Sequence, residues 1–130
     1  MKVHSIEDII SKMVDCLDAG RDLLSAKHYD AALNRSYYAM FHGVQALLFT
    51  IDKVTKSHTG AHNAFHKEFI LTGVIEKKLG LGLKKTFEKR QFSDYEYDET
   101  SEQTAIDSFE DAEYFVHTIV NYLKQNNHLK

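Results

Sequence analysis

The sequence predicts an all-α protein: an antiparallel bundle of four long helices and one short helix. The 130 residues include no proline and only six glycines, so the residues that usually punctuate strands and hairpins are scarce. Apolar residues recur at spacings of three and four in five segments, which is typical of helices that bury one face. With 43% hydrophobic residues at this length, we expect a single domain spanning residues 1–130.

The first predicted helix begins after Ser5 and continues to about Ala26. Ser5 and Asp8 have the spacing of a capping box, in which each side chain binds the backbone amide of the other residue. Apolar residues then form one stripe: Ile9, Ile10, Met13, Val14, Leu17, Leu23 and Leu24. The single cysteine, Cys16, falls within this pattern, so we expect a buried, inert thiol and a reducing compartment.

The second predicted helix runs from Ala31 to about Ile51, after a short turn at residues 27–29. Asp30 is its predicted N-cap, because a carboxylate there can accept hydrogen bonds from the first free amides. Apolar residues are so dense in this segment that we expect it to be the most buried helix of the bundle.

Three further helices are predicted after a polar loop at residues 52–57. Ser57 or Thr59 would cap a short helix that ends near Gly73. A fourth helix is defined by apolar residues four apart: Ile75, Leu79, Leu83 and Phe87. After a polar loop at residues 91–101, a capping box from Thr100 to Gln103 would start a long last helix.

Charge is distributed unevenly along the chain. Residues 1–90 carry 14 Lys or Arg and 10 Asp or Glu, whereas residues 91–130 carry nine acidic residues and two lysines. A local basic region can hold phosphate groups although the net charge is −3. Solvated helix faces would explain the same charges without a function. Because no signal-peptide pattern and no membrane-length apolar run is present, we expect a cytoplasmic protein with no membrane association.

Arg35 and His42 are the candidate catalytic residues. They are seven positions apart and therefore lie on one face of the second helix, with Tyr38 between them. A guanidinium can bind a phosphate through two parallel bonds, and an imidazole can transfer a proton near neutral pH. Together they suffice for cleavage of RNA by its own 2'-hydroxyl, with no metal and no cofactor, while Ser36 and Tyr38 orient them. Alternatively, Arg35 pairs with an acid such as Asp94, and His42 is a hydrogen-bonded core residue.

The fourth helix supplies the candidate RNA-binding residues, which are Lys77, Lys78, Lys84, Lys85 and Lys89. If they adjoin Arg35, they could guide an RNA backbone by charge, although a solvated lysine-rich face needs no function. Arg90 and Asp94, four residues apart, are expected to pair or to tie the following loop to the bundle.

Three histidines, His58, His62 and His66, recur every four residues, which is a spacing that metal-binding histidines use. Zinc sites usually add cysteine or carboxylate ligands, and the nearby acid at helical spacing is Glu68. We therefore expect a polar helix face, with His58 as a capping or turn residue, and no metal site.

Four stretches occur in an order and with gaps typical of one family: SYYAMFHGVQALL at 36–48, KSHTGAHNAFHKEFI at 56–70, GVIEKKLG at 73–80 and RQFSDYEY at 90–97. They resemble the small stand-alone HEPN proteins of bacteria and archaea over residues 8–125. The resemblance implies a dimerising antiparallel helical bundle. Many members are metal-independent ribonucleases whose motif is an arginine, four to six residues and a histidine, which Arg35 and His42 match.

Partners are also implied by the resemblance. Family members are often encoded beside a minimal nucleotidyltransferase (MNT) in a toxin–antitoxin pair, so we expect an MNT-type nucleotidyltransferase that contacts the acidic last helix or residues 92–97. A homodimer would use apolar surface from Tyr37, Phe41 and Val44, and could form a composite ribonuclease site. The alternative is a non-catalytic dimerisation module, or one that binds nucleotides or RNA, in which Arg35 and His42 are structural.

Overall fold

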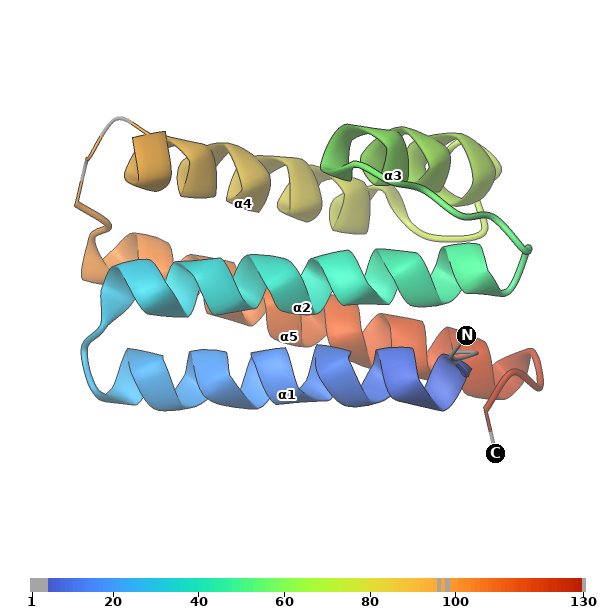
Figure 1. Cartoon of the computed structure of the whole chain (residues 1–130), viewed down its shortest axis with the longest axis horizontal. Helices are drawn as coiled ribbons and strands as arrows, with labels where there is room; N and C mark the ends of the chain where they lie inside the picture. The colour runs from blue at the N-terminus through green and yellow to red at the C-terminus, as the bar shows by residue number, and fades with distance from the viewer. Residues whose placement is uncertain (1–4, 96, 98, 130) are drawn as a thin grey trace.

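The computed structural model describes residues 5–95, 97 and 99–129, in which helices are joined by short loops and no β-strand occurs. Its elements in chain order are α1 (Ile6–Ser25), α2 (Tyr29–Phe49), α3 (His58–Phe65), the π-helical turn η1 (His66–Ile70), α4 (Lys77–Tyr95) and α5 (Glu102–Gln125). Figure 1 shows α2 in the middle, with α1 along one side, α3 and α4 along the other, and α5 behind. The predicted bundle of four long helices and one short helix is confirmed.

Two predicted caps are present, and both start helices where the sequence places them. Ser5 Oγ accepts from the amide of Asp8 at 3.2 Å, and Asp8 Oδ2 accepts from the amide of Ser5 at 3.1 Å. Ser57 Oγ accepts from the amide of Gly60 at 2.9 Å at the start of α3. Gly73 follows η1 with a φ of +78°, a conformation that glycine adopts without strain.

The prediction that Asp30 is the N-cap of α2 is wrong. α2 begins at Tyr29, one residue earlier, and the N-cap His28 makes no side-chain hydrogen bond. Asp30 Oδ1 instead accepts from Ser93 Oγ and from the amide of Thr100, both at 3.0 Å. A carboxylate at this point accepts from one donor near the end of α4 and one just before α5, and that tertiary contact replaces the local cap.

The predicted capping box at Thr100 is also wrong. The N-cap of α5 is Ser101, whose Oγ accepts from the amide of Thr104 at 3.1 Å. Thr100 lies one residue before this N-cap, and its own amide donates to Asp30.

The fourth helix is longer than the sequence pattern predicted. α4 runs from Lys77 to Tyr95, whereas apolar spacing indicated a helix over 75–87 and a polar loop from residue 91. Because no proline or glycine lies between 88 and 95, polar residues continue the helix there. A Cβ on Gly80 would lie 3.4 Å from Ile70, an ordinary van der Waals distance, so α4 packs against η1 at this point.

The core is centred on α2, which contributes more buried residues than any other helix, as its apolar density predicted. Tyr37 and Val44 are both 0% exposed, so the expectation that they supply apolar surface to a dimer is wrong. Phe41 remains partly exposed, and Phe49 is 40% exposed. Cys16 is buried, as predicted, and burial raises the pKa of its thiol.

Glycine is required where α2 crosses α5. A Cβ on Gly43 would lie 2.9 Å from the ring of Phe115, closer than carbon atoms normally approach. Phe115 is 1% exposed and fills the space between the two helices. The face of α2 opposite to this contact remains uncovered by α5 (Figure 1).

None of the helices within the described ranges combines the length with the apolar character that a bilayer crossing requires.

Candidate functional site

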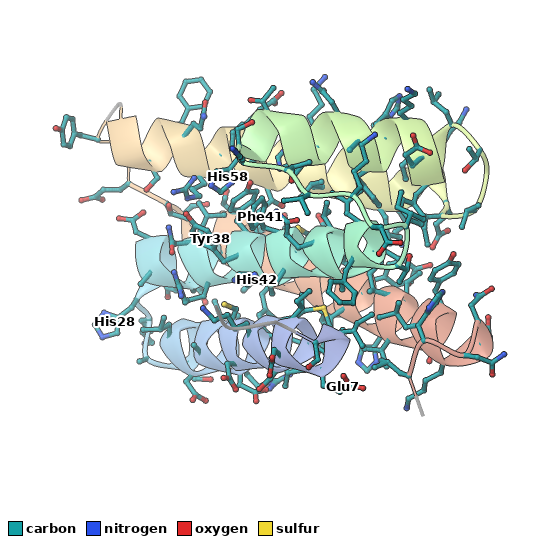
Figure 2. All side chains as sticks on the ribbon, turned by 45° about the vertical axis from the view of Figure 1, so that its right-hand side comes forward. Glu7, His28, Tyr38, Phe41, His42 and His58 are labelled. Carbon is teal, nitrogen blue, oxygen red and sulfur yellow. The ribbon has the colours of Figure 1, made fainter. Side chains whose placement is uncertain are left out.

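Arg35, Tyr38 and His42 form a stripe along the side of α2 that faces away from the core. The Arg35 Cζ lies 5.2 Å from the centre of the Tyr38 ring, and the Tyr38 and His42 ring centres are 6.3 Å apart. Figure 2 shows Tyr38 and His42 on this side of α2, next to Phe41. The structure therefore brings together the guanidinium, hydroxyl and imidazole that the spacing places on one face.

The Arg35 guanidinium has polar but not acidic neighbours. Its Nη2 and Nε donate to Asn34 Oδ1 at 2.8 and 3.3 Å, and its Nη1 lies 3.9 Å from Cys16 Sγ. No carboxylate of residues 5–95, 97 and 99–129 with a described side chain forms an ion pair with it. The alternative partner, Asp94, has a side chain outside the described ones. Arg35 is thus a partly buried cation, and the binding of an anion next to it would be favourable because it would compensate the buried charge.

His42 is half-buried and lines a pocket of about 320 Å³ between α1 and α2, together with Asp8, Ile9, Lys12, Phe41 and Gln45. Burial lowers the pKa of His42, and the charges of Lys12 and Arg35 lower it further. The imidazole makes no hydrogen bond to the part of the chain that the structure describes. It is therefore neutral at pH 7 and open to a proton from a ligand.

Arg90 of α4 reaches the same stripe from the other side. Its Nη2 donates to the Tyr38 hydroxyl at 3.2 Å, and its Cζ lies 5.1 Å from the Tyr38 ring centre and 5.3 Å from that of Tyr37. The predicted pairing of Arg90 with Asp94 involves a side chain outside the described ones. Arg90 comes seven residues after Leu83 and three after Phe87, so helical spacing places it on the apolar face of α4. The sequence analysis did not use this spacing.

His58 and His62 converge on one phenol. The Tyr37 hydroxyl lies 2.7 Å from His58 Nδ1 and 2.9 Å from His62 Nε2, and burial raises the pKa of this phenol. Burial lowers the pKa of His62 to about 4, and the proximity of His58 adds to the effect. Burial, followed by the charge of Arg90, lowers the pKa of His58. Both imidazoles are therefore neutral at pH 7.

The spacing of the three histidines does not place them together. His58 is the first residue of α3 rather than its cap, and its ring turns toward α2 (Figure 2). His66 is exposed, whereas His58 and His62 both contact the Tyr37 hydroxyl. Within the described ranges, no group of three or more His, Cys, Asp or Glu side chains is arranged to hold a metal ion.

Ser36 lies apart from the stripe. It is 0% exposed, and its Oγ would be 3.5 Å from a Cβ on Gly20 of α1. The residue is adjacent to Arg35 in sequence, but a step of 100° turns its side chain into the bundle. The structure does not bring it to the side of α2 that carries Arg35 and His42.

The five candidate RNA-binding lysines lie on the solvent side of α4. Lys77, Lys78, Lys84 and Lys85 are exposed, and Lys89 is half-buried. Lys78 Nζ lies 4.2 Å from the ring centre of Tyr114 in α5. Around the helix Arg90 points about 100° away from Lys89 and about 120–140° away from the other four, so most of the lysines face away from the Arg35–His42 stripe.

Comparison with known families decides the classification. The family described as "HEPN domain" matches residues 6–124. The chain belongs to the HEPN family. The family assignment predicted from the four sequence stretches is therefore confirmed.

Relatives of this HEPN chain include proteins named as toxins. A "UPF0332 protein" of Thermotoga maritima is 38% identical over 106 residues, which cover 81% of this chain and 80% of that protein. In Methanocaldococcus jannaschii, "Putative toxin MJ0142" is 37% identical over 114 residues, covering 88% of this chain and 74% of that protein. "Putative toxin MJ0605" is 34% identical over 122 residues, which cover 94% of this chain and 91% of that protein.

Proposed function

We propose that this HEPN protein is a toxin-type endoribonuclease that cleaves RNA without a metal ion through Arg35 and His42. The observation that carries the proposal is a partly buried guanidinium with no ion pair to the described side chains, on the same face of α2 as a neutral imidazole. The names of the M. jannaschii relatives support a toxin role.

The chemistry follows from the two side chains. Arg35 binds the scissile phosphate with charge-assisted hydrogen bonds and offsets the negative charge that grows on its oxygens. His42 removes the proton from the 2'-hydroxyl, whose oxygen then attacks phosphorus while the bond from phosphorus to the 5'-oxygen breaks, and solvent protonates the departing oxygen. The neutral state of His42 favours this general-base role, because a protonated imidazole cannot accept the proton.

Tyr38 and the lysines would assist without reacting. The Tyr38 ring contacts the Arg35 guanidinium, and its hydroxyl accepts from Arg90, so it holds both cations beside the stripe. Lysines on the outer side of α4 would attract the RNA backbone over a distance of ~8 Å, without reading its sequence. Ser36 has no part in this mechanism, because it is buried against α1.

The assembly we propose is a homodimer in a complex with an MNT-type nucleotidyltransferase. Phe41 and Phe49 give the uncovered side of α2 an apolar edge that a second copy could cover. Exposed acids on α5, such as Glu102 and Glu110, suit a basic partner surface. Light scattering of the isolated protein tests the dimer, and co-purification with the product of a neighbouring nucleotidyltransferase gene tests the partner.

Activity is tested with single-stranded RNA in EDTA. The wild-type protein should cleave it, and His42→Asn should lose roughly 100-fold or more of the rate. Arg35→Gln should lose a comparable factor, because a neutral amide cannot offset the phosphate charge. Lys27→Gln, which removes an exposed charge outside the stripe, is the matched control and should retain activity. No cleavage by the wild-type protein, together with a marked loss of stability in both variants, would favour a structural role for Arg35 and His42.

A further inference from the structure

A second pocket, between α3, η1 and α4, is not used by the mechanism above. Its volume is about 380 Å³, within the range of pockets that hold small molecules or parts of larger ones. α3 and α4 lie on the same side of α2 (Figure 1). The residues that line this α3–α4 pocket do not include Arg35, Tyr38 or His42, so the pocket is separate from the stripe.

The inner surface of the α3–α4 pocket is apolar. Phe65, Ile70 and Leu83 line it, and all three side chains are buried in the core. Gly80 of α4 also lines the pocket, and because glycine has no side chain it leaves this part of the space to a ligand. Burial of a flat, largely apolar group such as a nucleobase against these residues would be favourable, since it removes apolar surface from water.

The mouth of the α3–α4 pocket is polar and carries a positive charge. Thr59, Asn63 and His66 line it from α3 and η1 at spacings of four and three residues, and Lys84 lines it from α4. All four side chains are exposed, and none of them makes a hydrogen bond or an ion pair to the described part of the chain. The Asn63 amide can both donate to and accept from the edge of a base, and the Lys84 ammonium can bind a phosphate.

His62 links the α3–α4 pocket to the residues next to the stripe. Its Nε2 lies 2.9 Å from the Tyr37 hydroxyl, so Nδ1 is the ring nitrogen left to contact a ligand. The Tyr37 ring in turn contacts the ring of Tyr38, with 5.3 Å between the centres. The pocket therefore lies near the candidate cleavage site but outside it.

We infer that the α3–α4 pocket holds one unpaired nucleotide of the single-stranded RNA substrate, away from the phosphate that is cut. The base enters the apolar interior, Asn63 hydrogen-bonds its edge, and Lys84 binds the adjoining phosphate. The inference rests on the proposed ribonuclease function, to which it adds a second point of contact with the substrate.

A polymer suits this position better than a free nucleotide. Lys77 precedes Lys84 by seven residues, so it lies on the same side of α4, about 10.5 Å along the helix. Both lysines are exposed. A strand that places one phosphate at Lys84 can therefore place a further phosphate near Lys77.

The test measures binding by fluorescence anisotropy with a labelled single-stranded 2'-O-methyl RNA, which cannot be cut because it lacks the attacking 2'-hydroxyl. Lys84→Gln should weaken binding roughly threefold to tenfold and make the slope of log affinity against log salt concentration less steep by about 0.7, as for one lost phosphate contact. Lys85→Gln removes the same charge from the same helix outside the pocket. This matched control should change the affinity by less than about twofold.

Asn63→Leu tests entry of the base. It should weaken binding of the single strand roughly tenfold and leave binding of a duplex of the same sequence unchanged, because paired bases cannot enter the pocket. Gln91→Leu, which removes an exposed amide outside the pocket, is the matched control and should bind both RNAs as the wild-type protein does.

Equal losses in Lys84→Gln and Lys85→Gln, or wild-type binding of the single strand by Asn63→Leu, would overturn the inference. Binding of adenosine 5'-monophosphate as tightly as the single strand would assign the pocket to a free nucleotide and would also overturn it. Because the 2'-O-methyl RNA is bound without being cut, these results decide the inference alone. Failure of the wild-type protein to cut ordinary RNA decides the proposed function separately.

Discussion

The Arg90 guanidinium donates to the Tyr38 hydroxyl at 3.2 Å, and this bond joins α4 to the stripe of functional candidates on α2. Arg90 also lies over the Tyr37 ring, whose hydroxyl binds both His58 and His62. A single residue of α4 therefore contacts Tyr38 of the Arg35–His42 stripe and Tyr37, the residue that binds the histidine pair of α3. The two tyrosines and Arg90 thereby connect candidate residues that come from three helices.

Removing the charge of Arg90 should raise the pKa of His58. Arg90 is the second cause, after burial, of the lowered pKa of this imidazole, because a nearby positive charge opposes protonation. The histidine resonances of Arg90→Gln, followed by NMR as a function of pH, measure this shift. Lys89→Gln removes the neighbouring charge on α4 and should leave the pKa of His58 unchanged. An unaltered value in Arg90→Gln would show that the two groups do not interact in solution.

Acid should weaken the fold through the neutral histidines. The pKa of His62 is about 4 in the folded protein, below the ~6.5 of an unfolded chain. The unfolded state therefore binds more protons, so the stability contributed by neutral His62 is present above pH ~6.5 and is lost as the pH falls toward 4. His42 and His58, with lowered pKa values, act in the same direction.

Denaturant midpoints measured between pH 7 and 4 test this dependence. The slope of stability against pH should be smaller in His62→Gln than in the wild-type protein. It should be unchanged in His66→Gln, because His66 is exposed. A wild-type midpoint that stays constant across this range would contradict neutral burial of His62.

Substitution of Gly43 should destabilise the crossing of α2 and α5. In Gly43→Ala, the new methyl group would lie 2.9 Å from the Phe115 ring, so the ring or the helices must move, at a cost of about 1–3 kcal/mol. In Gly82→Ala, the nearest atoms lie at an ordinary 3.7 Å, and replacing a helical glycine should be neutral or stabilising by up to about 1 kcal/mol. Urea unfolding of both variants makes the comparison, and equal stabilities would show that the crossing is looser than described.

Sequence periodicity predicted the helices because each of them buries one face, and α2 was recognised as the central one from its apolar density. The predicted starts of α2 and α5 are wrong because tertiary hydrogen bonds compete with local capping there. Asp30 accepts from Ser93 and Thr100 instead of capping its own helix. Local spacing placed Arg35, Tyr38 and His42 on one face, since a single helix fixes their relation. It could not place Ser36 in the core or indicate that Arg90 and His58 meet that face, because those contacts depend on how α1, α3 and α4 pack.

The measurement that tests the central claim most directly is the chemistry of the RNA ends left by the wild-type protein in EDTA. Attack by the 2'-hydroxyl, with Arg35 and His42 as the reacting site, predicts fragments that carry a 2',3'-cyclic phosphate on one side of the cut and a 5'-hydroxyl on the other. These products should disappear in His42→Asn and Arg35→Gln proteins that remain folded. Fragments with a 3'-hydroxyl and a 5'-phosphate, or cleavage that survives in His42→Asn, would contradict the account.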